Sequence, residues 1–137
     1  MQRVLADANV FVSLLTGRHE EQLEVATALL QQAEDGAIVV ILPQFVVFEV
    51  TYVLQSVYNV AADRLAAMIR DLLFLPGVLV VDECPWSRVL EYWPVPLTSL
   101  ADAAIVAVAE SRRYDAIATF DRKLAKRAKD LGVASYW

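Results

Sequence analysis

Short apolar runs alternate along this chain with longer segments in which apolar residues recur at helical spacing. The short runs predict buried strands at Val4–Ala6, Ile38–Leu42, Val78–Val81, Ala116–Ala118 and Val133–Ser135. The longer segments predict helices at Val10–Leu15, Glu20–Glu34, Pro43–Tyr58, Ala62–Phe74, Trp86–Trp93, Leu100–Ser111 and Asp121–Lys129. This alternation indicates an α/β fold with a mainly parallel central sheet of four to five strands.

No long polar, Gly/Ser-rich or Pro-rich stretch divides the 137 residues, which predicts a single domain over residues 1–137. Hydrophobic residues make up 58% of the chain, above the usual share of about 45–50%. A well-filled core and an apolar surface that meets a partner would both explain the excess. We expect both, with a homodimer.

The most apolar region, residues 37–58, contains a proline, two glutamines and Glu49, which argue against a membrane span. The first residues lack a secretory signal pattern, because Asp7 interrupts the apolar run. The single cysteine, Cys84, is compatible with a reducing cytosol. We therefore expect a cytoplasmic protein with no membrane partner.

Four acidic residues border or interrupt apolar runs, where carboxylates are rare unless they are paired or bound to a metal. They are Asp7, Glu49, Asp102 and Asp121. Sites in parallel α/β folds lie beyond the carboxyl ends of the strands, and Asp7 and Asp121 each follow a predicted strand. Asp102 begins a helix, and Glu49 lies about 9 Å along another, at about 1.5 Å per residue. We expect all four to converge on one crevice.

Each Asp also has a structural explanation as a helix cap. Asp7 or Asn9 could cap the helix after the first strand, and Asp121 could cap the last helix. Ser99 with Asp102 resembles a capping box in which Asp replaces the usual Glu or Gln. The sequence alone leaves the cap and the shared site open for these three acids.

Glu49 has no such explanation, because it lies within a helix between Phe48 and Val50. An isolated ionised Glu in apolar surroundings is costly or has a raised pKa. Neither Lys nor Arg occurs between residues 19 and 63. A cation from outside the chain would supply the missing charge.

The chemistry of the four acids favours a hard metal ion. One cysteine, Cys84, and one histidine, His19, exclude a disulfide framework and a Cys/His zinc cage. Carboxylate ligands without His or Cys favour Mg²⁺ or Mn²⁺. One or two such ions in a carboxylate cluster support hydrolysis of phosphodiester bonds.

Four motifs now carry a resemblance: DANV after the first strand, Glu49 within a helix, LADAAIVAVA, and ATFDRKL. In order and spacing they resemble the PIN-domain family, above all the small single-domain toxins of the VapC type. The resemblance covers almost the whole chain and implies a three-layer α/β/α PIN-like fold. It also implies a Mg²⁺- or Mn²⁺-dependent endoribonuclease that acts on RNA. Such proteins are commonly homodimeric toxins of type II toxin–antitoxin systems, held inactive by a cognate antitoxin protein.

The resemblance assigns catalytic and metal-binding roles to the four acids Asp7, Glu49, Asp102 and Asp121. It gives Asn9 and Thr119 supporting roles in ordering ligands or water. The position before Asp121, the last of these four acids, is often polar among relatives, whereas this chain has Phe120.

The charge distribution has two readings. The net charge is −5, yet seven of the twelve Lys and Arg residues lie between Arg112 and Lys129. This segment could contact phosphates, or it could be an ordinary solvated helix face.

Two other functions fit parts of the pattern. A phosphatase of the haloacid-dehalogenase type also begins with an acid after a strand. Its mechanism needs a second Asp two residues later, where this chain has Asn9. A non-catalytic PIN-like module that binds RNA or protein is the other alternative, although such a module does not need four buried carboxylates.

Overall fold

A computed structural model describes residues 1–137 and confirms the alternation of strands and helices. The strands are β1 (Gln2–Ala6), β2 (Ile38–Pro43), β3 (Val78–Val81) and β4 (Ala116–Ala118). The helices are α1 (Ala8–Thr16), α2 (Glu20–Glu34), α3 (Gln44–Ser56), α4 (Ala62–Leu73), α5 (Trp86–Tyr92), α6 (Leu100–Ser111) and α7 (Arg122–Asp130). The strand order is β3-β2-β1-β4, and all neighbouring strands are parallel.

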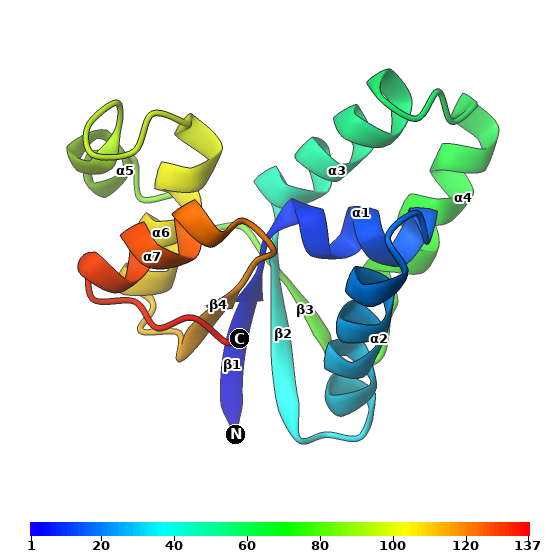
Figure 1. Ribbon diagram of the computed structural model, residues 1–137, viewed down its shortest axis with the longest axis horizontal. Helices are drawn as coiled ribbons and strands as arrows, with labels where there is room; N and C mark the ends of the chain where they lie inside the picture. Colours follow the sequence, from blue (N-terminus) through cyan, green and yellow to red (C-terminus); the bar gives the residue numbers. More distant parts are fainter.

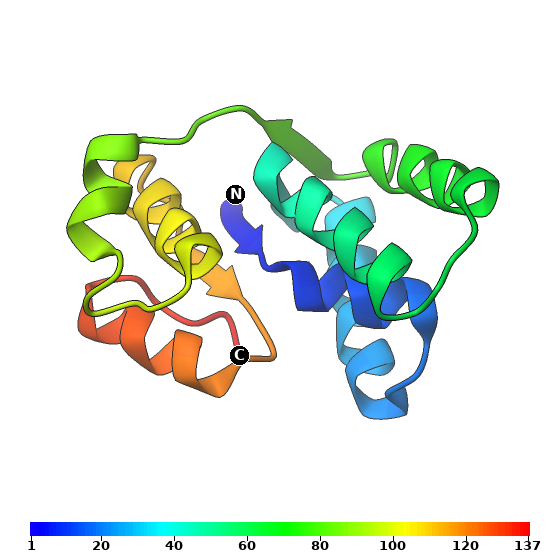
Figure 2. The same cartoon turned by 90° about the horizontal axis from the view of Figure 1, so that it is seen from above.

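Helices cover both faces of the sheet, with α1 to α4 on one side and α5 to α7 on the other (Figures 1 and 2). This is the expected three-layer α/β/α arrangement. Strands covered on both faces consist of continuous apolar residues, and β2 has such a sequence, IVVILP. Every residue of α6 from Ala103 to Ala109 is buried, because its small side chains let the helix lie close to β4.

Gly77 lets the turn before β3 lie against the end of α2. Its φ of +76° lies in the left-handed region, a backbone conformation that residues other than glycine rarely adopt. A Cβ at this position would lie 2.2 Å from the backbone oxygen of Ala33. Both the conformation and the close approach therefore require glycine.

Some predicted boundaries are wrong. Residues 133–135 form no strand but a single parallel bridge, in which Ile117 pairs with Ser135. Ile117 donates its N–H to Ala134 and accepts one from Tyr136, and β4 is too short to pair further. Pro43 ends β2 and precedes α3 rather than opening the helix. None of the helices combines the length and apolar character needed to cross a bilayer.

Candidate active site

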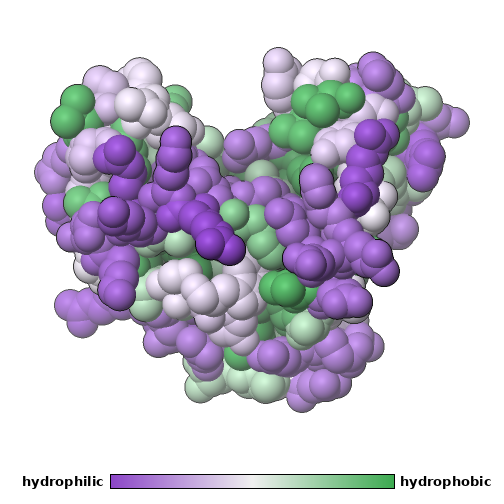
Figure 3. Space-filling model, in the orientation of Figure 1, coloured by the Kyte–Doolittle hydropathy of each residue, from purple (hydrophilic) through white to green (hydrophobic).

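The carboxyl ends of the strands meet at one edge of the sheet, and the register there brings Asp7 next to Thr119. Ala6 of β1 is paired with Ala118 of β4, so the residue after each strand lies beside the other. The Asp7 N–H donates to the Ala118 carbonyl at 2.9 Å. The space-filling view shows the molecule hollowed above this edge, between α3 and the segment around α5 (Figure 3).

All four acids singled out from the sequence line one cavity at this edge. Its volume is about 220 Å³, and its lining residues are Asp7, Ala8, Asn9, Val12, Glu49, Val53, Asp102 and Asp121. The lining residues follow β1 and β4 or lie on α1, α3 and α6. The fold therefore brings together residues that lie up to 114 positions apart in the sequence.

Asp7 is the buried centre of the site. One carboxylate oxygen, Oδ1, accepts the Ala8 N–H at 2.7 Å, so Asp7 caps α1 as one of the sequence readings predicted. The other, Oδ2, accepts the Thr119 hydroxyl at 2.8 Å and the Asn9 amide at 3.2 Å. Burial nevertheless raises the pKa of Asp7, and the charge of Asp121 raises it further.

Asn9 and Thr119 connect Asp7 to the loop after β4. The Asn9 amide nitrogen also donates to the Thr119 hydroxyl at 3.1 Å, and its oxygen accepts the Phe120 N–H at 3.1 Å. The Thr119 hydroxyl accepts the Asp121 N–H, again at 3.1 Å. Two polar side chains therefore fix the positions of Asp7 and Asp121, the first and last of the four acids, relative to each other.

Glu49 is half-buried in α3, and its Oε2 atom is buried without a hydrogen-bond partner. Burial raises the pKa of Glu49 to about 7, and the charges of Asp7 and Asp102 contribute to the shift. A buried carboxylate oxygen without a partner is costly. The sequence shows no Lys or Arg near Glu49, and the structure likewise shows no group of the chain that pairs with this oxygen.

Asp102 is the third residue of α6. Its backbone N–H donates to the Ser99 hydroxyl at 3.2 Å, so Ser99 caps the helix. The Asp102 carboxylate does not return a hydrogen bond to Ser99, so only half of the predicted capping box forms and the carboxylate remains at the cavity. Burial, followed by the charges of Asp7 and Asp121, raises its pKa to about 6.

Asp121 is the most exposed of the four acids and caps α7, as predicted. Its Oδ1 atom accepts the Lys123 N–H at 2.9 Å and the Leu124 N–H at 3.2 Å. Other acids near the sheet do not line the cavity. Asp115 binds the Arg3 N–H at the opposite edge, at 2.7 Å, and Glu83 forms an ion pair with Arg112.

The four acids have no cationic partner within the chain. The ion pairs of the protein join Arg88 and Arg112 to three other glutamates, and none reaches the cavity. No three Asp, Glu, His or Cys side chains are grouped as a ready-made metal site. Mg²⁺ usually keeps several of its waters and binds through one or two carboxylates. The all-oxygen donors and the unpartnered Glu49 oxygen therefore fit such an ion with water between it and some of the acids.

Three apolar residues line the cavity beside the acids, and Ala8 is the first of them. Val12 and Val53 are the other two. Val53 lies four residues after Glu49, and residues four apart on a helix share a face. That spacing already places Val53 beside the acid in the sequence.

Comparisons with known proteins bear on the family and the fold. The family model of the PIN domain matches residues 4–130. The structure is similar to VapC20 of Mycobacterium tuberculosis, described as a toxin that cleaves the sarcin-ricin loop. The TM-score is 0.72 and the identity 15%, over 96% of each chain.

Two further structures share the fold at low identity. VapBC2 of Rickettsia felis, bound to a DNA fragment from its promoter, has a TM-score of 0.67 and 12% identity, over 98% of this chain and 97% of that one. A domain of a functionally unknown protein from Methanocaldococcus jannaschii has a TM-score of 0.57 and 22% identity, over 100% and 91%. No curated protein sequence matches the chain.

Proposed function

The chain belongs to the PIN domain family, and on this basis we propose that it is a metal-dependent endoribonuclease that hydrolyses RNA phosphodiester bonds. The observation that carries the proposal is the cavity that four carboxylates share without any Lys or Arg. Their mutual repulsion and burial favour a divalent cation, which would restore the charge balance.

In this proposal Asp7, Glu49, Asp102 and Asp121 hold Mg²⁺ or Mn²⁺, directly or through water. When bound, the ion would polarise a water for attack on phosphorus and offset charge on the phosphate. Thr119 and Asn9 keep the Asp7 carboxylate oriented through their hydrogen bonds. The Val12 and Val53 side chains form apolar parts of the cavity wall beside the acids.

We further propose that the protein is the toxin of a type II toxin–antitoxin pair in the cytoplasm, with a cognate antitoxin protein as its partner. Two observations support this. VapC20 is described as a toxin and shares the fold over 96% of both chains. A chain of VapBC2, whose structure was solved with a DNA fragment from the promoter, also shares the fold. Co-expression with the neighbouring reading frame, followed by co-purification, tests the pairing.

A homodimer is proposed from the apolar side chains that remain exposed. Phe48 and Tyr52 are one helical turn apart on α3 and are 73% and 70% exposed. Large apolar side chains on one face mark protein interfaces more often than isolated ones do. Sedimentation of wild type and Phe48→Ser tests this, because loss of a partner surface would shift the variant towards the monomer.

The test of the nuclease is cleavage of an RNA panel with Mg²⁺ or Mn²⁺ by wild type, Asp102→Asn and Asp71→Asn. Asp102 is the informative position, because its carboxylate makes no hydrogen bond that the fold needs. Asp71 is an exposed acid on α4 and serves as the matched control. We expect Asp102→Asn to lose at least about 100-fold in rate, about 2.7 kcal/mol. Equal rates for the three proteins would refute the assignment.

A non-catalytic binding module is the second candidate, favoured by the absence of a ready-made group of three ligands. It predicts RNA or protein binding without cleavage at any Mg²⁺ or Mn²⁺ concentration. Calorimetric titration with Mn²⁺ separates the two, since only the enzyme requires a metal at the four acids.

A further inference from the structure

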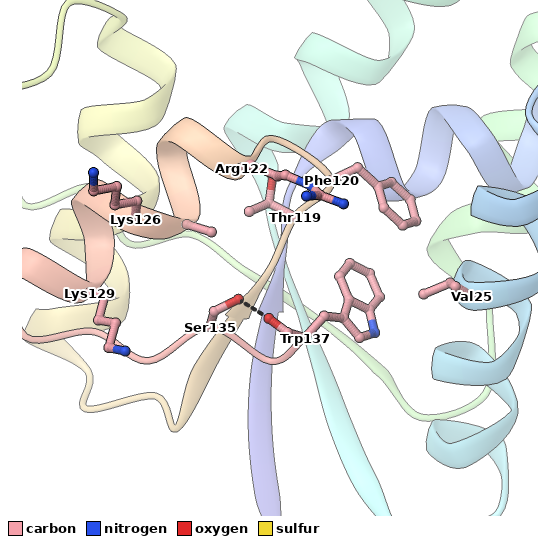
Figure 4. A pocket seen from close by; sticks show the side chains of 9 residues that line it. Val25, Thr119, Phe120, Arg122, Lys126, Lys129, Ser135 and Trp137 are labelled. Carbon is pink, nitrogen blue, oxygen red and sulfur yellow. Dashed lines mark hydrogen bonds between the residues drawn. The ribbon is translucent and has the colours of Figure 1, made fainter.

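We propose that a groove beside the acidic cavity binds a single-stranded segment of the RNA, by stacking a base on Trp137 and Phe120 and contacting phosphates with cations of α7. This inference rests on the proposed ribonuclease function and adds a binding site to it. The groove has a volume of about 690 Å³ and is shown in Figure 4. We call it the aromatic–basic groove, and its lining residues are Val25, Thr119, Phe120, Arg122, Ala125, Lys126, Lys129, Ser135 and Trp137.

The first element of the groove is a pair of stacked aromatic rings. Phe120 and Trp137 lie with their ring centroids 4.8 Å apart and their planes 8° from parallel (Figure 4). The Tyr136 ring lies edge-on to Trp137, with the two ring centroids 6.1 Å apart, and supports the indole. Trp137 remains 44% exposed. The pair therefore presents a supported flat surface, which is the feature that single-strand binding proteins use to stack bases.

The second element is a row of cations along one face of α7. Arg122, Lys126 and Lys129 are separated by four and three residues, which places them on the same side of the helix. The side chains of these three residues form no ion pair or hydrogen bond within the chain. Like charges at this spacing destabilise a helix, and Arg122 also lies in the first turn, where the helix dipole disfavours a cation.

Charge complementarity identifies the occupant as a polyanion. No acidic residue lines the groove, although the protein has a net charge of −5. A chain of phosphates would relieve the repulsion among the three cations, and the neighbouring aromatic surface would hold a base of the same strand. An acidic protein segment would satisfy the cations, but only a nucleic-acid strand carries a flat base beside every anionic group.

The groove lies next to the acidic cavity, and residues of the two are joined by hydrogen bonds. Thr119 lines the groove and donates its hydroxyl hydrogen to Asp7 in the cavity. Phe120 lies between Thr119 and Asp121, and its N–H donates to Asn9. A strand seated on the aromatic pair would therefore extend towards the four acids. The groove would thus hold nucleotides that flank the cleaved bond.

Binding without cleavage tests the proposal. A fluorescein-labelled ten-nucleotide oligoadenylate is titrated in EDTA with Asp102→Asn protein, and anisotropy gives the Kd. Adding Trp137→Leu should weaken binding about tenfold, because a stacking surface is lost. Adding Trp137→Phe should change the Kd less than about threefold, since a flat ring remains. Circular dichroism confirms that both variants are folded.

Charge variants test the second element independently, at exposed positions that the fold does not need. The slope of log Kobs against log salt is negative, and Lys126→Gln with Lys129→Gln should reduce its magnitude by about 1.4, at about 0.7 per contact with single strands. Arg64→Gln with Arg70→Gln removes the same charge from α4, on the other side of the molecule, and should leave the slope unchanged (Figure 1).

Several results would overturn the inference. One is an equal Kd for the Trp137→Leu and Trp137→Phe proteins. Another is an equal change of the salt slope in the α7 and α4 charge variants. A third is competition by polyglutamate that is as strong as competition by unlabelled RNA. A shift in sedimentation caused by Trp137→Leu would instead assign the groove to a second copy of the chain. Because the assay contains neither metal nor cleavage, its failure is distinct from a failure of the nuclease proposal, which the metal-dependent cleavage assay measures.

Discussion

Replacing Glu49 by Gln should stabilise the protein without metal and weaken the effect of Mg²⁺. Burial, followed by the charges of Asp7 and Asp102, raises the pKa of Glu49 from 4.5 to about 7. At about 1.36 kcal/mol per pKa unit, this rise corresponds to a ceiling of about 3 kcal/mol. Glu49 is only half-buried, so solvent screening reduces the expected gain to about 1–2 kcal/mol.

The sign of the effect depends on pH. Because the pKa of Glu49 is higher in the folded state, folded protein binds more protons than unfolded protein between pH 4.5 and about 7. The free energy of unfolding of the wild type should therefore fall as the pH rises through this window. The amide introduced by Glu49→Gln cannot ionise, so this variant should exceed the wild type in stability only slightly at pH 5 and by the full amount at pH 8.

The assay is urea unfolding in EDTA and in Mg²⁺, at pH 5 and pH 8, for wild type, Glu49→Gln and Glu24→Gln. Glu24 is an exposed residue of α2 and controls for the loss of one charge. A tenfold weaker affinity for Mg²⁺ removes about 1.4 kcal/mol of stabilisation at saturating metal. The reasoning fails if Glu49→Gln is no more stable than wild type at pH 8 in EDTA, or if Mg²⁺ stabilises both equally.

Three further predictions concern the supports of the site and of the fold. Thr119→Val should cost about 1–3 kcal/mol in urea unfolding, because Asp7 loses a buried donor, and unchanged stability would show that water replaces the hydroxyl. Thr119→Ser keeps the donor and should recover most of that loss in the same assay. Gly77→Ala should lower the Tm more than Gly36→Ala does. Both glycines have positive φ, but only at Gly77 would a Cβ meet a backbone oxygen, at 2.2 Å. Equal shifts in Tm would contradict the role of the close approach.

Local sequence patterns were enough to predict most of the elements. Four of the elements, α2, β3, α6 and β4, have the predicted bounds, because polar or turn residues mark where each of them ends. The caps formed by Asp7 and Asp121 were also predictable, since a cap depends on residues within one turn. The strand expected at residues 133–135 failed because its partner β4 has only three residues, which the chain end itself does not reveal.

The site could be predicted only in part. Glu49 was identified from the sequence because an acid within an apolar helix is unusual wherever the helix lies. Whether its neighbours neutralise it depends on the packing of other elements, and only the structure shows that its buried oxygen has no partner. The stacked pair of Phe120 and Trp137 likewise had no signal, because these residues are 17 positions apart and belong to no shared element.

By itself the sequence determined the alternation of strands and helices, the two aspartate caps and the four acids that required an explanation, because these depend on local spacing and on the cost of burying charge. The tertiary structure decided which distant groups meet. Asp7 and Thr119 are 112 residues apart, yet they share a hydrogen bond because β1 pairs with β4 in parallel register. Such pairing depends on the packing of the whole sheet between its two helix layers, and no local pattern encodes it.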